Sequence, residues 1–150
     1  MSFTTAQLAS YVGGECCGDQ TVVCNGAEID TRRSVQGKVF FALQGTQSDG
    51  HDYLDDAVAG GCSAVVIERS CSLKIPFVVV SDARTALFKL AEARRSELQV
   101  QQVIAVTGSV GKTTTKDLLA HLLGDNTTAS MHSFNNDLGV PLTILDAEDA

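Results

Sequence analysis

Short runs of apolar and β-branched residues recur along the first half of the chain, each bounded by glycine or by polar residues. Runs of this length with such boundaries are typical of buried strands, whereas a helix needs a longer segment to build an apolar stripe. The pattern predicts strands at residues 21–24, 39–43, 64–67 and 76–80. Polar, glycine-containing segments separate them, as expected for surface loops.

Apolar residues at helical spacing lie before and between these runs. A capping-box pattern at Thr4 and Gln7 opens the first predicted helix, and Gly13 ends it. A second helix is predicted over residues 52–59, and a third over residues 82–98, capped by Asp82. In the third helix we expect Leu87, Leu90, Ala91 and Leu98 to be buried, and Glu92, Arg94, Arg95 and Glu97 to form the solvated face. Strands and helices together predict a compact mixed α/β unit.

The second half centres on a short apolar run at residues 103–106, which predicts a buried parallel strand. A glycine-bounded turn follows, and then a helix is predicted over residues 112–123, with its leucines on one side and Gly124 as its end. A further strand is predicted at residues 127–131, before an asparagine-rich loop that leads to residues 138–145. His121 lies among the leucines of the helix, so we expect it to pack rather than to react.

The turn between that strand and helix has the composition of a phosphate-binding loop. Backbone N–H groups of such a loop and the positive end of the helix face an anion, while the lysine reaches the outer phosphates. The general pattern G-x-x-x-x-G-K-[ST] would place its first glycine at Val106, so the chain carries the shorter form T-G-x-x-G-K-T. The Thr113 hydroxyl is the predicted Mg²⁺ ligand. The predicted nucleotide-binding residues are Thr107, Gly108, Ser109, Val110, Gly111, Lys112, Thr113 and Thr114.

Composition narrows the possible functions. The 150 residues are 44% hydrophobic and 19% charged, which indicates a globular protein with a real core. A net charge of −7 argues against a nucleic-acid or anionic-membrane surface. The absence of a long apolar run or a charged-then-apolar leader favours a cytoplasmic protein without a membrane span. The five cysteines form no C-x-x-C pair, so we expect reduced thiols rather than a metal or redox site.

Two separate blocks of residues resemble the Mur ligase family. The first block is D-T-R at residues 30–32, F-F-A-L-Q-G at 40–45 and D-G-H at 49–51, which is similar to the family's UDP-sugar-binding segment. The second is T-G-S-V-G-K-T-T-T at residues 107–115 with F-N-N-D-L-G-V-P-L-T at 134–143. The family's ATP loop has the T-G-x-x-G-K-T form, which accounts for Val106. The resemblance spans nearly the whole chain.

The resemblance implies a fold class and two domains. A small mixed α/β UDP-sugar-binding domain is expected over residues 1–81, followed over residues 82–150 by the start of a P-loop parallel-sheet ATP-binding domain. Family members are much longer, and this chain stops before the segment with their metal-binding glutamate. We therefore expect it not to ligate by itself. An unfinished sheet also exposes strand edges and apolar helix faces, so the second unit is expected to be loosely ordered or prone to aggregation.

The resemblance also implies an activity. The N-N-x-x-G-x-P-L-T block is similar to members that join D-Ala-D-Ala to UDP-MurNAc-tripeptide, using ATP and Mg²⁺ and passing through an acyl phosphate. Charge on the transferred phosphoryl group must then be neutralised by positioned cations. The implied partners are these two substrates, and the protein is expected to be a monomer. The alternative, of a different class, is a nucleotide- or UDP-sugar-binding module without catalysis; a folyl-polyglutamate-type ligase fits less well, since it lacks the first block.

Site residues follow from both blocks. In the first domain the resemblance implies substrate-binding residues, of which Arg32 suits a diphosphate because its fork pairs bidentately with phosphate oxygens. Asp49 and His51 either line a uridine pocket or brace the glycine loop. Arg33 is expected to be a solvated neighbour, and His132 receives no role. The implied substrate-binding residues are Thr31, Arg32, Gly45, Asp49, Gly50 and His51, and the implied catalytic residues are Lys112, Asn135 and Asn136, although either asparagine could instead only shape its turn.

Overall fold

A five-stranded sheet forms the centre of the computed structural model, which describes all residues except 47, 101, 126, 131–137 and 148–150. Its order is β2-β7-β6-β5-β4, with β4 to β7 parallel and β2 antiparallel at one edge. A separate antiparallel pair joins β1 (Ser2–Thr4) to β3 (Val23–Asn25). The strands of the main sheet are β2 (Glu15–Cys17), β4 (Ala27–Glu28), β5 (Val39–Phe41), β6 (Ala64–Ile67) and β7 (Phe77–Val79).

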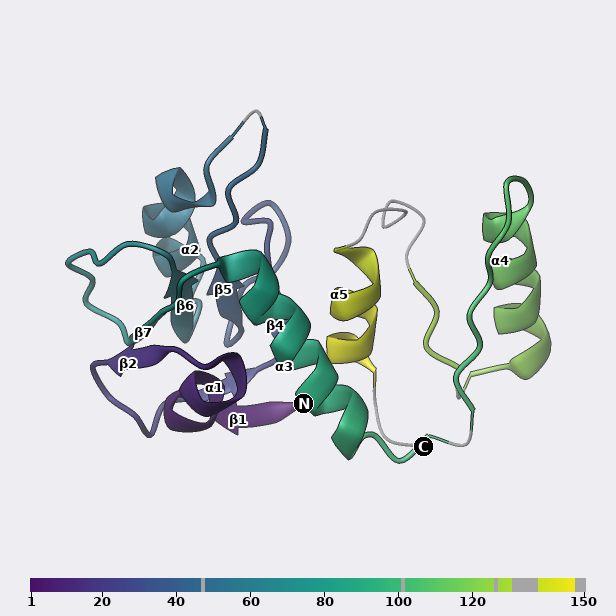
Figure 1. Cartoon of the computed structure of the whole chain (residues 1–150), viewed down its shortest axis with the longest axis horizontal. Helices are drawn as coiled ribbons and strands as arrows, with labels where there is room; N and C mark the ends of the chain where they lie inside the picture. The colour runs from purple at the N-terminus through teal and green to yellow at the C-terminus, as the bar shows by residue number, and fades with distance from the viewer. Residues whose placement is uncertain (47, 101, 126, 131–137, 148–150) are drawn as a thin grey trace.

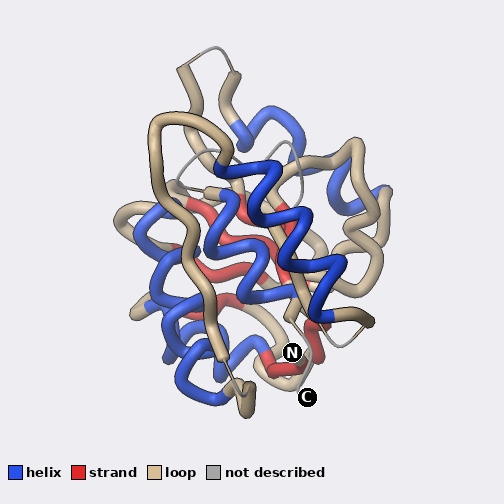
Figure 2. Tube along the Cα trace, turned by 90° about the vertical axis from the view of Figure 1, so that its right-hand side faces the viewer, coloured by secondary structure: helices blue, strands red, loops and turns tan. Residues whose placement is uncertain are grey.

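The two faces of this sheet bury two separate apolar clusters. Because successive strand residues point to opposite faces, Val39 and Phe41 of β5 enter one cluster and Phe40 enters the other. The first cluster lies under α1 (Thr5–Val12), α3 (Ala83–Glu97) and α5 (Gly139–Asp146). The second lies under α2 (Leu54–Ala59), which follows the short 3₁₀ helix η1 (Gly50–Tyr53). Figure 2 shows several helices in front of the strands of the sheet.

Most helices of the first half were predicted correctly, because their end signals are local. Thr4 caps α1 with both bonds of the capping box, and Gly13 ends it in the left-handed conformation at φ 70°. Asp82 caps α3 by accepting a hydrogen bond from the Thr85 N–H at 2.5 Å. The four residues predicted to face the core of α3 are buried: Leu87, Leu90, Ala91 and Leu98.

One prediction for α3 is wrong. Arg94 was expected on the solvated face, but its side chain is buried, with only 6% exposed. Its Nη2 donates a hydrogen bond to the Ala147 carbonyl at 2.7 Å, just past the end of α5. The helical pattern places Arg94 beside the apolar stripe, and packing of α5 against that side of α3 buries it. Residues on both sides of position 81 thus share one core cluster; the domain boundary after residue 81 stays a prediction.

Strand predictions were correct where the apolar run was longest. The run at 64–67 is β6, the runs at 39–43 and 76–80 contain β5 and β7, and the run at 21–24 overlaps β3. The predictions missed β1, β2 and β4, each of two or three residues. Such short strands exist only because a neighbouring strand pairs with them, which a local pattern does not reveal.

The strand predicted at residues 103–106 is absent from the described structure. These residues form no hydrogen-bonded strand, and Val103 and Ile104 are 60% and 45% exposed. A buried parallel strand needs neighbours to pair with on the sheet, and no described strand of the chain pairs with this segment. Residues 127–130 also form no strand, and residue 131 lies outside the described residues. Both strand predictions for the second half are therefore wrong for the described residues.

The helix predicted at residues 112–123 does form, as α4 (Lys112–Leu123), but no residue of it is buried. Figure 1 shows it apart from the sheet, at the end of the extended segment that begins after α3. His121 is exposed rather than packed, so that prediction is wrong, because no leucine of α4 is buried in the described structure. By contrast, α5 buries Pro141, Leu142 and Leu145 against the core.

Candidate functional site

The predicted substrate-binding residues lie on loops that follow the carboxyl ends of the parallel strands. We call this end of the main sheet the loop edge. Thr31 and Arg32 follow β4, and the segment from Gly45 to His51 follows β5, its immediate neighbour. The two strands are parallel, so both loops leave the same edge. Ligands of open parallel sheets bind at the carboxyl ends of the strands. The fold therefore brings the two parts of the first sequence block together, and Figure 1 shows the loop after β5 at the top of the view.

Arg32 has the geometry of a guanidinium held ready for an anion. Its side chain is 88% exposed, and its Nε and Nη2 donate to the Asp30 carboxylate at 2.9 and 2.6 Å. The hydrogen bond with Arg32 lowers the pKa of Asp30, and the same bond raises the pKa of Arg32. The pair thus stays charged near neutral pH, and the remaining N–H groups of the fork point to solvent beside half-buried Thr31.

Asp49 and His51 brace their loop. One oxygen of Asp49 accepts from the His51 backbone N–H at 2.9 Å and from its Nδ1 at 2.7 Å. The Glu68 backbone N–H donates to the other ring nitrogen, Nε2, at 3.1 Å. Since Nε2 accepts, the proton of the neutral ring belongs on Nδ1. With both ring nitrogens engaged and 6% of its side chain exposed, His51 fits the bracing alternative rather than the pocket-lining one.

The same loop depends on Gly50 for its shape. Its N–H donates to the Leu43 carbonyl at 2.8 Å, which closes the segment between β5 and η1. A Cβ at this position would lie 2.6 Å from the Leu43 nitrogen and 2.8 Å from backbone atoms of Ala42. No side chain fits that space without moving the backbone. Gly45 donates its N–H to the Ser48 carbonyl at 2.9 Å and stays exposed.

Two residues of this edge were missed from the sequence, Glu68 and Arg69, which follow β6 directly. Arg69 donates from Nη2 to the second oxygen of Asp49 at 2.8 Å. Together with the His51 N–H groups, which contribute most, this bond lowers the pKa of Asp49 to about 2. The Glu68 carboxylate accepts from the Ala83 N–H at the start of α3, at 2.8 Å. The available signal was their position: polar residues directly after a buried strand, at the edge predicted to hold the site.

Arg33 is not the solvated neighbour that the sequence predicted. Its Nε lies 3.4 Å from a carboxylate oxygen of Glu28, which is only 2% exposed, and Lys38 lies 4.0 Å from the same oxygen. A buried carboxylate requires such partners, because an unpaired buried charge is costly. Glu28 lies in β4, one of the strands that the sequence pattern missed, so its need for a partner was hidden. Arg33 therefore stabilises the fold by pairing with Glu28, whereas its neighbour Arg32 stays exposed.

The phosphate loop has features that fit an anion. Gly108 and Gly111 have positive φ angles of 150° and 81°, and α4 starts at Lys112 without a side-chain cap. The first-turn N–H groups of a helix without such a cap are available to a phosphate. The Lys112 ammonium donates to the Gly108 carbonyl, within the loop that it would share with a phosphate.

The Mg²⁺ prediction rests on Thr113, which is half-buried in the first turn of α4. Its hydroxyl would be one oxygen ligand, and phosphate oxygens and water normally complete the octahedron of this ion. The described residues contain no group of three or more His, Cys, Asp or Glu side chains placed to hold a metal. The residues before it in the loop, from Thr107 to Val110, are exposed. Asn135 and Asn136 lie outside the described residues, so their predicted role stays a prediction.

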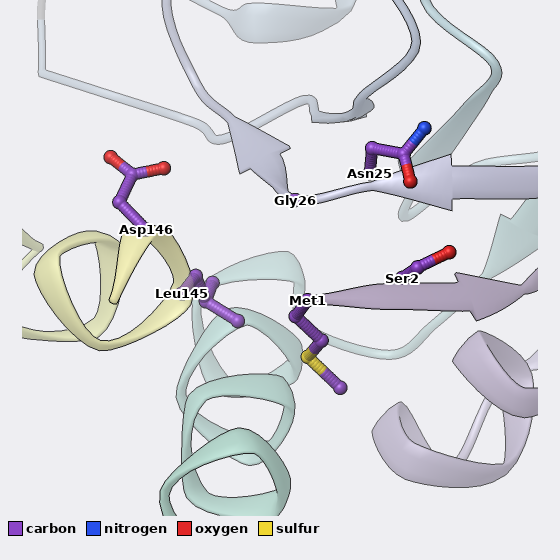
Figure 3. A pocket seen from close by; sticks show the side chains of 6 residues that line it. All are labelled: Met1, Ser2, Asn25, Gly26, Leu145 and Asp146. Carbon is purple, nitrogen blue, oxygen red and sulfur yellow. The ribbon is translucent and has the colours of Figure 1, made fainter. Parts of the chain in front are cut away.

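An open hollow lies away from both predicted sites. It measures about 280 Å³ and is lined by β1, the turn after β3 and the end of α5, as Figure 3 shows. Its lining residues are Met1, Ser2, Asn25, Gly26, Leu145 and Asp146. None of the site residues that were predicted from the sequence lines this hollow. The candidate site is therefore the loop edge of the sheet together with the phosphate loop, rather than this hollow.

Comparison with known families identifies the protein family. The model of the Mur ligase family catalytic domain matches residues 24–113, and that of the Mur ligase middle domain matches residues 106–150. The chain belongs to the Mur ligase family. The first block of site residues lies inside the catalytic-domain match, and the second block lies inside the middle-domain match. Mur ligase domains therefore account for the loop edge of the sheet and for the phosphate loop in one chain.

Individual relatives narrow the resemblance within the Mur ligases. The UDP-N-acetylmuramoyl-tripeptide–D-alanyl-D-alanine ligase of Haemophilus influenzae is 40% identical over 97% of this chain and 33% of its own length. The enzyme of the same name from Escherichia coli is 37% identical over 97% of this chain and 32% of its own length. The chain thus spans about a third of the length of these relatives.

Solved Mur ligases share the fold. A crystal structure of MurF from Acinetobacter baumannii superposes with a TM-score of 0.86 at 36% identity, covering 99% of this chain and 34% of that one. MurF from Thermotoga maritima, solved in complex with ADP, superposes with a TM-score of 0.68 at 32% identity, covering 83% of this chain and 30% of that one. The mixed α/β fold with a parallel sheet is confirmed.

Two further properties complete the description. Among the described residues no helix combines the length and the apolar composition needed to cross a membrane. The five cysteines, all in the described part, are free thiols. Burial raises the pKa of Cys24 to about 12 and that of Cys62 to about 11, so these two thiols stay protonated and behave as small apolar side chains.

Proposed function

We propose that this chain is the substrate- and nucleotide-binding front part of an ATP-dependent ligase that joins D-Ala-D-Ala to UDP-MurNAc-tripeptide. The observation that carries the proposal is the match, over 97% of the chain, to relatives that bear that name. In this proposal residues 1–81 bind the sugar nucleotide, and residues 82–150 begin the ATP-binding domain. The protein would act as a monomer in the cytoplasm.

The geometry supports the following roles for these residues. Arg32, held by Asp30 at the edge of the sheet, binds phosphate oxygens of the sugar nucleotide, and Asp49 and His51 hold the neighbouring loop in shape. Lys112 moves from the Gly108 carbonyl to the outer phosphates of ATP, while Thr113 supplies a hydroxyl for Mg²⁺. When bound, the ion and Lys112 neutralise charge on the phosphoryl group that passes to the substrate carboxylate.

A second candidate is a UDP-sugar-binding module without catalysis. The observation that favours it is the uneven packing of the two halves: the sheet and its covering helices bury two apolar clusters, whereas α4 buries no residue. A phosphate loop whose supporting strand is unpaired holds its N–H groups in place less firmly, which weakens an anion site. The two candidates therefore differ in whether ATP binds.

Calorimetric titration distinguishes these candidates. We would titrate the 150-residue chain with UDP-MurNAc-tripeptide and, separately, with Mg-ATP, and repeat both on Arg32→Ala and Lys112→Ala. The ligase proposal expects both ligands to bind, with Arg32→Ala losing the sugar nucleotide alone and Lys112→Ala losing ATP alone. Each loss should be about tenfold or more, as expected for a charged hydrogen-bond partner.

Other results would redirect the proposal. Sugar-nucleotide binding with weak ATP binding that Lys112→Ala removes would support the fragment of a ligase, whereas sugar-nucleotide binding with no ATP binding would favour the module. Tight ATP binding without any sugar-nucleotide binding would contradict the muramyl assignment and leave a smaller nucleotide-binding protein. Arg95→Ala, which removes an exposed positive charge from α3, is the matched control and should leave both affinities unchanged.

A further inference from the structure

Arg69 is an exposed cation at the predicted substrate edge. It follows Ile67 and Glu68 at the end of β6, and 64% of its side chain is exposed. Its Nη2 donates to Asp49 at 2.8 Å, so the guanidinium has a fixed direction rather than a free one. Neither sequence block includes it.

The topology pairs Arg69 with Arg32. In the sheet, β5 lies between β4 and β6, and all three strands are parallel. Arg32 follows β4 and Arg69 follows β6, so the two arginines leave the same edge on either side of β5. The loop that follows β5 and leads into η1 leaves the sheet between them.

The spacing of the strands places both arginines within reach of one ligand. Arg69 is bonded to Asp49, the residue that caps η1 at its start. Neighbouring strands lie about 4.8 Å apart, so β4 and β6, on either side of β5, end about 10 Å apart. One sugar nucleotide can span the distance between residues that follow these two strand ends.

The two guanidinium groups are held in a similar way. Each guanidinium is held by one aspartate, Asp30 or Asp49, and carries five N–H groups, more than its aspartate uses. A guanidinium already fixed in direction loses less conformational entropy when it binds an oxyanion. Arg69 thus has what Arg32 has: exposure, a fixed fork and a place at the carboxyl edge of the sheet.

We propose that Arg69 is a second oxyanion-binding residue of the sugar-nucleotide site, acting with Arg32 on phosphate or carboxylate oxygens of one ligand. This inference rests on the proposed function, because it needs a sugar nucleotide at this edge. The competing role is purely structural: Arg69 would only steady Asp49, and through it the loop at Gly50 and His51.

Binding of graded ligands separates the two roles. The full 150-residue chain would be titrated with uridine, UDP, UDP-MurNAc and UDP-MurNAc-tripeptide, followed by NMR chemical shifts so that weak binding is measured. We expect Arg69→Ala to weaken UDP binding about tenfold to a hundredfold, the range for a lost hydrogen bond to a charged group, and to leave uridine binding within about twofold. Loss confined to UDP-MurNAc-tripeptide would identify peptide carboxylates as the anion instead of the phosphates, and would also support the inference.

Two variants control for charge and folding. Arg95→Ala removes one positive charge from the exposed face of α3 and should change no affinity. Arg69→Lys keeps the charge but not the planar fork, so it should recover part of the lost UDP affinity. A thermal unfolding curve of each variant shows whether it folds.

Three results would overturn the inference. An equal loss for uridine and UDP would mean that Arg69 acts only on loop shape. Unchanged affinity for every ligand in folded Arg69→Ala would remove Arg69 from the site, while the proposed function would stand if wild type binds and Arg32→Ala does not. Failure of the wild-type chain to bind any of the four ligands would overturn the substrate assignment and this inference with it.

Discussion

Asp49 is the residue whose shifted pKa makes the stability of the fold depend most clearly on pH. The His51 N–H groups and Arg69 lower its pKa from 3.8 to about 2. A carboxyl group with a lowered pKa in the folded state stabilises the fold above its unfolded pKa, and that contribution disappears as pH falls through the folded pKa. The stabilisation by Asp49 is therefore complete above about pH 4 and is lost between about pH 4 and pH 2.

This behaviour predicts how Asp49→Asn should differ from wild type. At pH 6 the variant should unfold at a lower urea concentration, because a neutral amide in place of the carboxylate cannot accept charged hydrogen bonds from both His51 and Arg69. The difference should shrink as pH falls below 4. Urea unfolding at several pH values measures it, with exposed Asp125→Asn as the control. A difference that stays constant down to pH 2.5 would contradict the assignment of this pH dependence to Asp49.

Single residues were predictable where their chemistry alone names a role. The fork of Arg32 and the glycine at position 50 follow from residue type and motif, and their geometry in the structure suits the expected roles. The surroundings of Arg33, Arg94 and His121 were not predictable. Whether such a side chain is buried depends on which distant element covers it, and here Glu28 and the end of α5 decide two of the three cases.

Among the elements, α3 connects the most parts of the molecule. Its start is bonded to Glu68 beside the loop edge, its middle packs on α1, and buried Arg94 binds the residue after α5. A charged group buried at one point of contact stabilises that contact only while its partners remain. The bond between Arg94 and the Ala147 carbonyl should therefore hold α5 on α3.

Replacing Arg94 tests this connection. We expect Arg94→Ala to lower the free energy of unfolding by about 2–3 kcal/mol, through the lost charged hydrogen bond and lost packing of the side-chain stem. The adjacent exposed residue gives the control: Arg95→Ala should change it by less than about 0.5 kcal/mol. Urea unfolding measures both. Similar values for the two variants would show that the buried bond does not stabilise the packing of α5.

Elements were predictable in proportion to their local signals. Helix α1 carries its capping box and glycine stop in the sequence, and β6 carries a complete apolar run. Residues 103–106 carry an equally clear apolar run but form no strand, because hydrogen-bonded neighbours make a strand and the described residues offer this run none. The sequence pattern reports the preference of a segment for burial, and the rest of the fold determines whether burial occurs.

For the whole molecule, the exposed apolar residues of the second half are the main departure from an ordinary surface. Leu118, Leu122 and Leu123 on α4 are 57%, 70% and 53% exposed, and Val103 and Ile104 precede them on the extended segment. Exposed apolar surface of this kind favours association with other molecules. We therefore expect this 150-residue chain, taken by itself, to self-associate as its concentration rises, whereas the proposed monomer is the longer ligase.

A charge in this surface should prevent the association. Leu122→Glu should shift the sedimentation profile towards monomer at high concentration, with no change in thermal midpoint, because Leu122 contacts no core cluster. Gln102→Glu adds the same charge without removing apolar surface and is the control. Sedimentation velocity measures the outcome. Equal effects of both variants would attribute the association to net charge, and no effect of either would exclude α4 as the contact.

The hydrogen bond between Lys112 and the Gly108 carbonyl affects how a measured affinity of the phosphate loop for ATP is interpreted. The ammonium has three N–H donors, so a phosphate either shares it with the carbonyl or replaces the carbonyl as its acceptor. The measured affinity is then the difference between two states of the same lysine, and Lys112→Ala removes a favourable contact from both. Its effect on ATP binding consequently reports how much better a phosphate satisfies the ammonium than the loop's own backbone does.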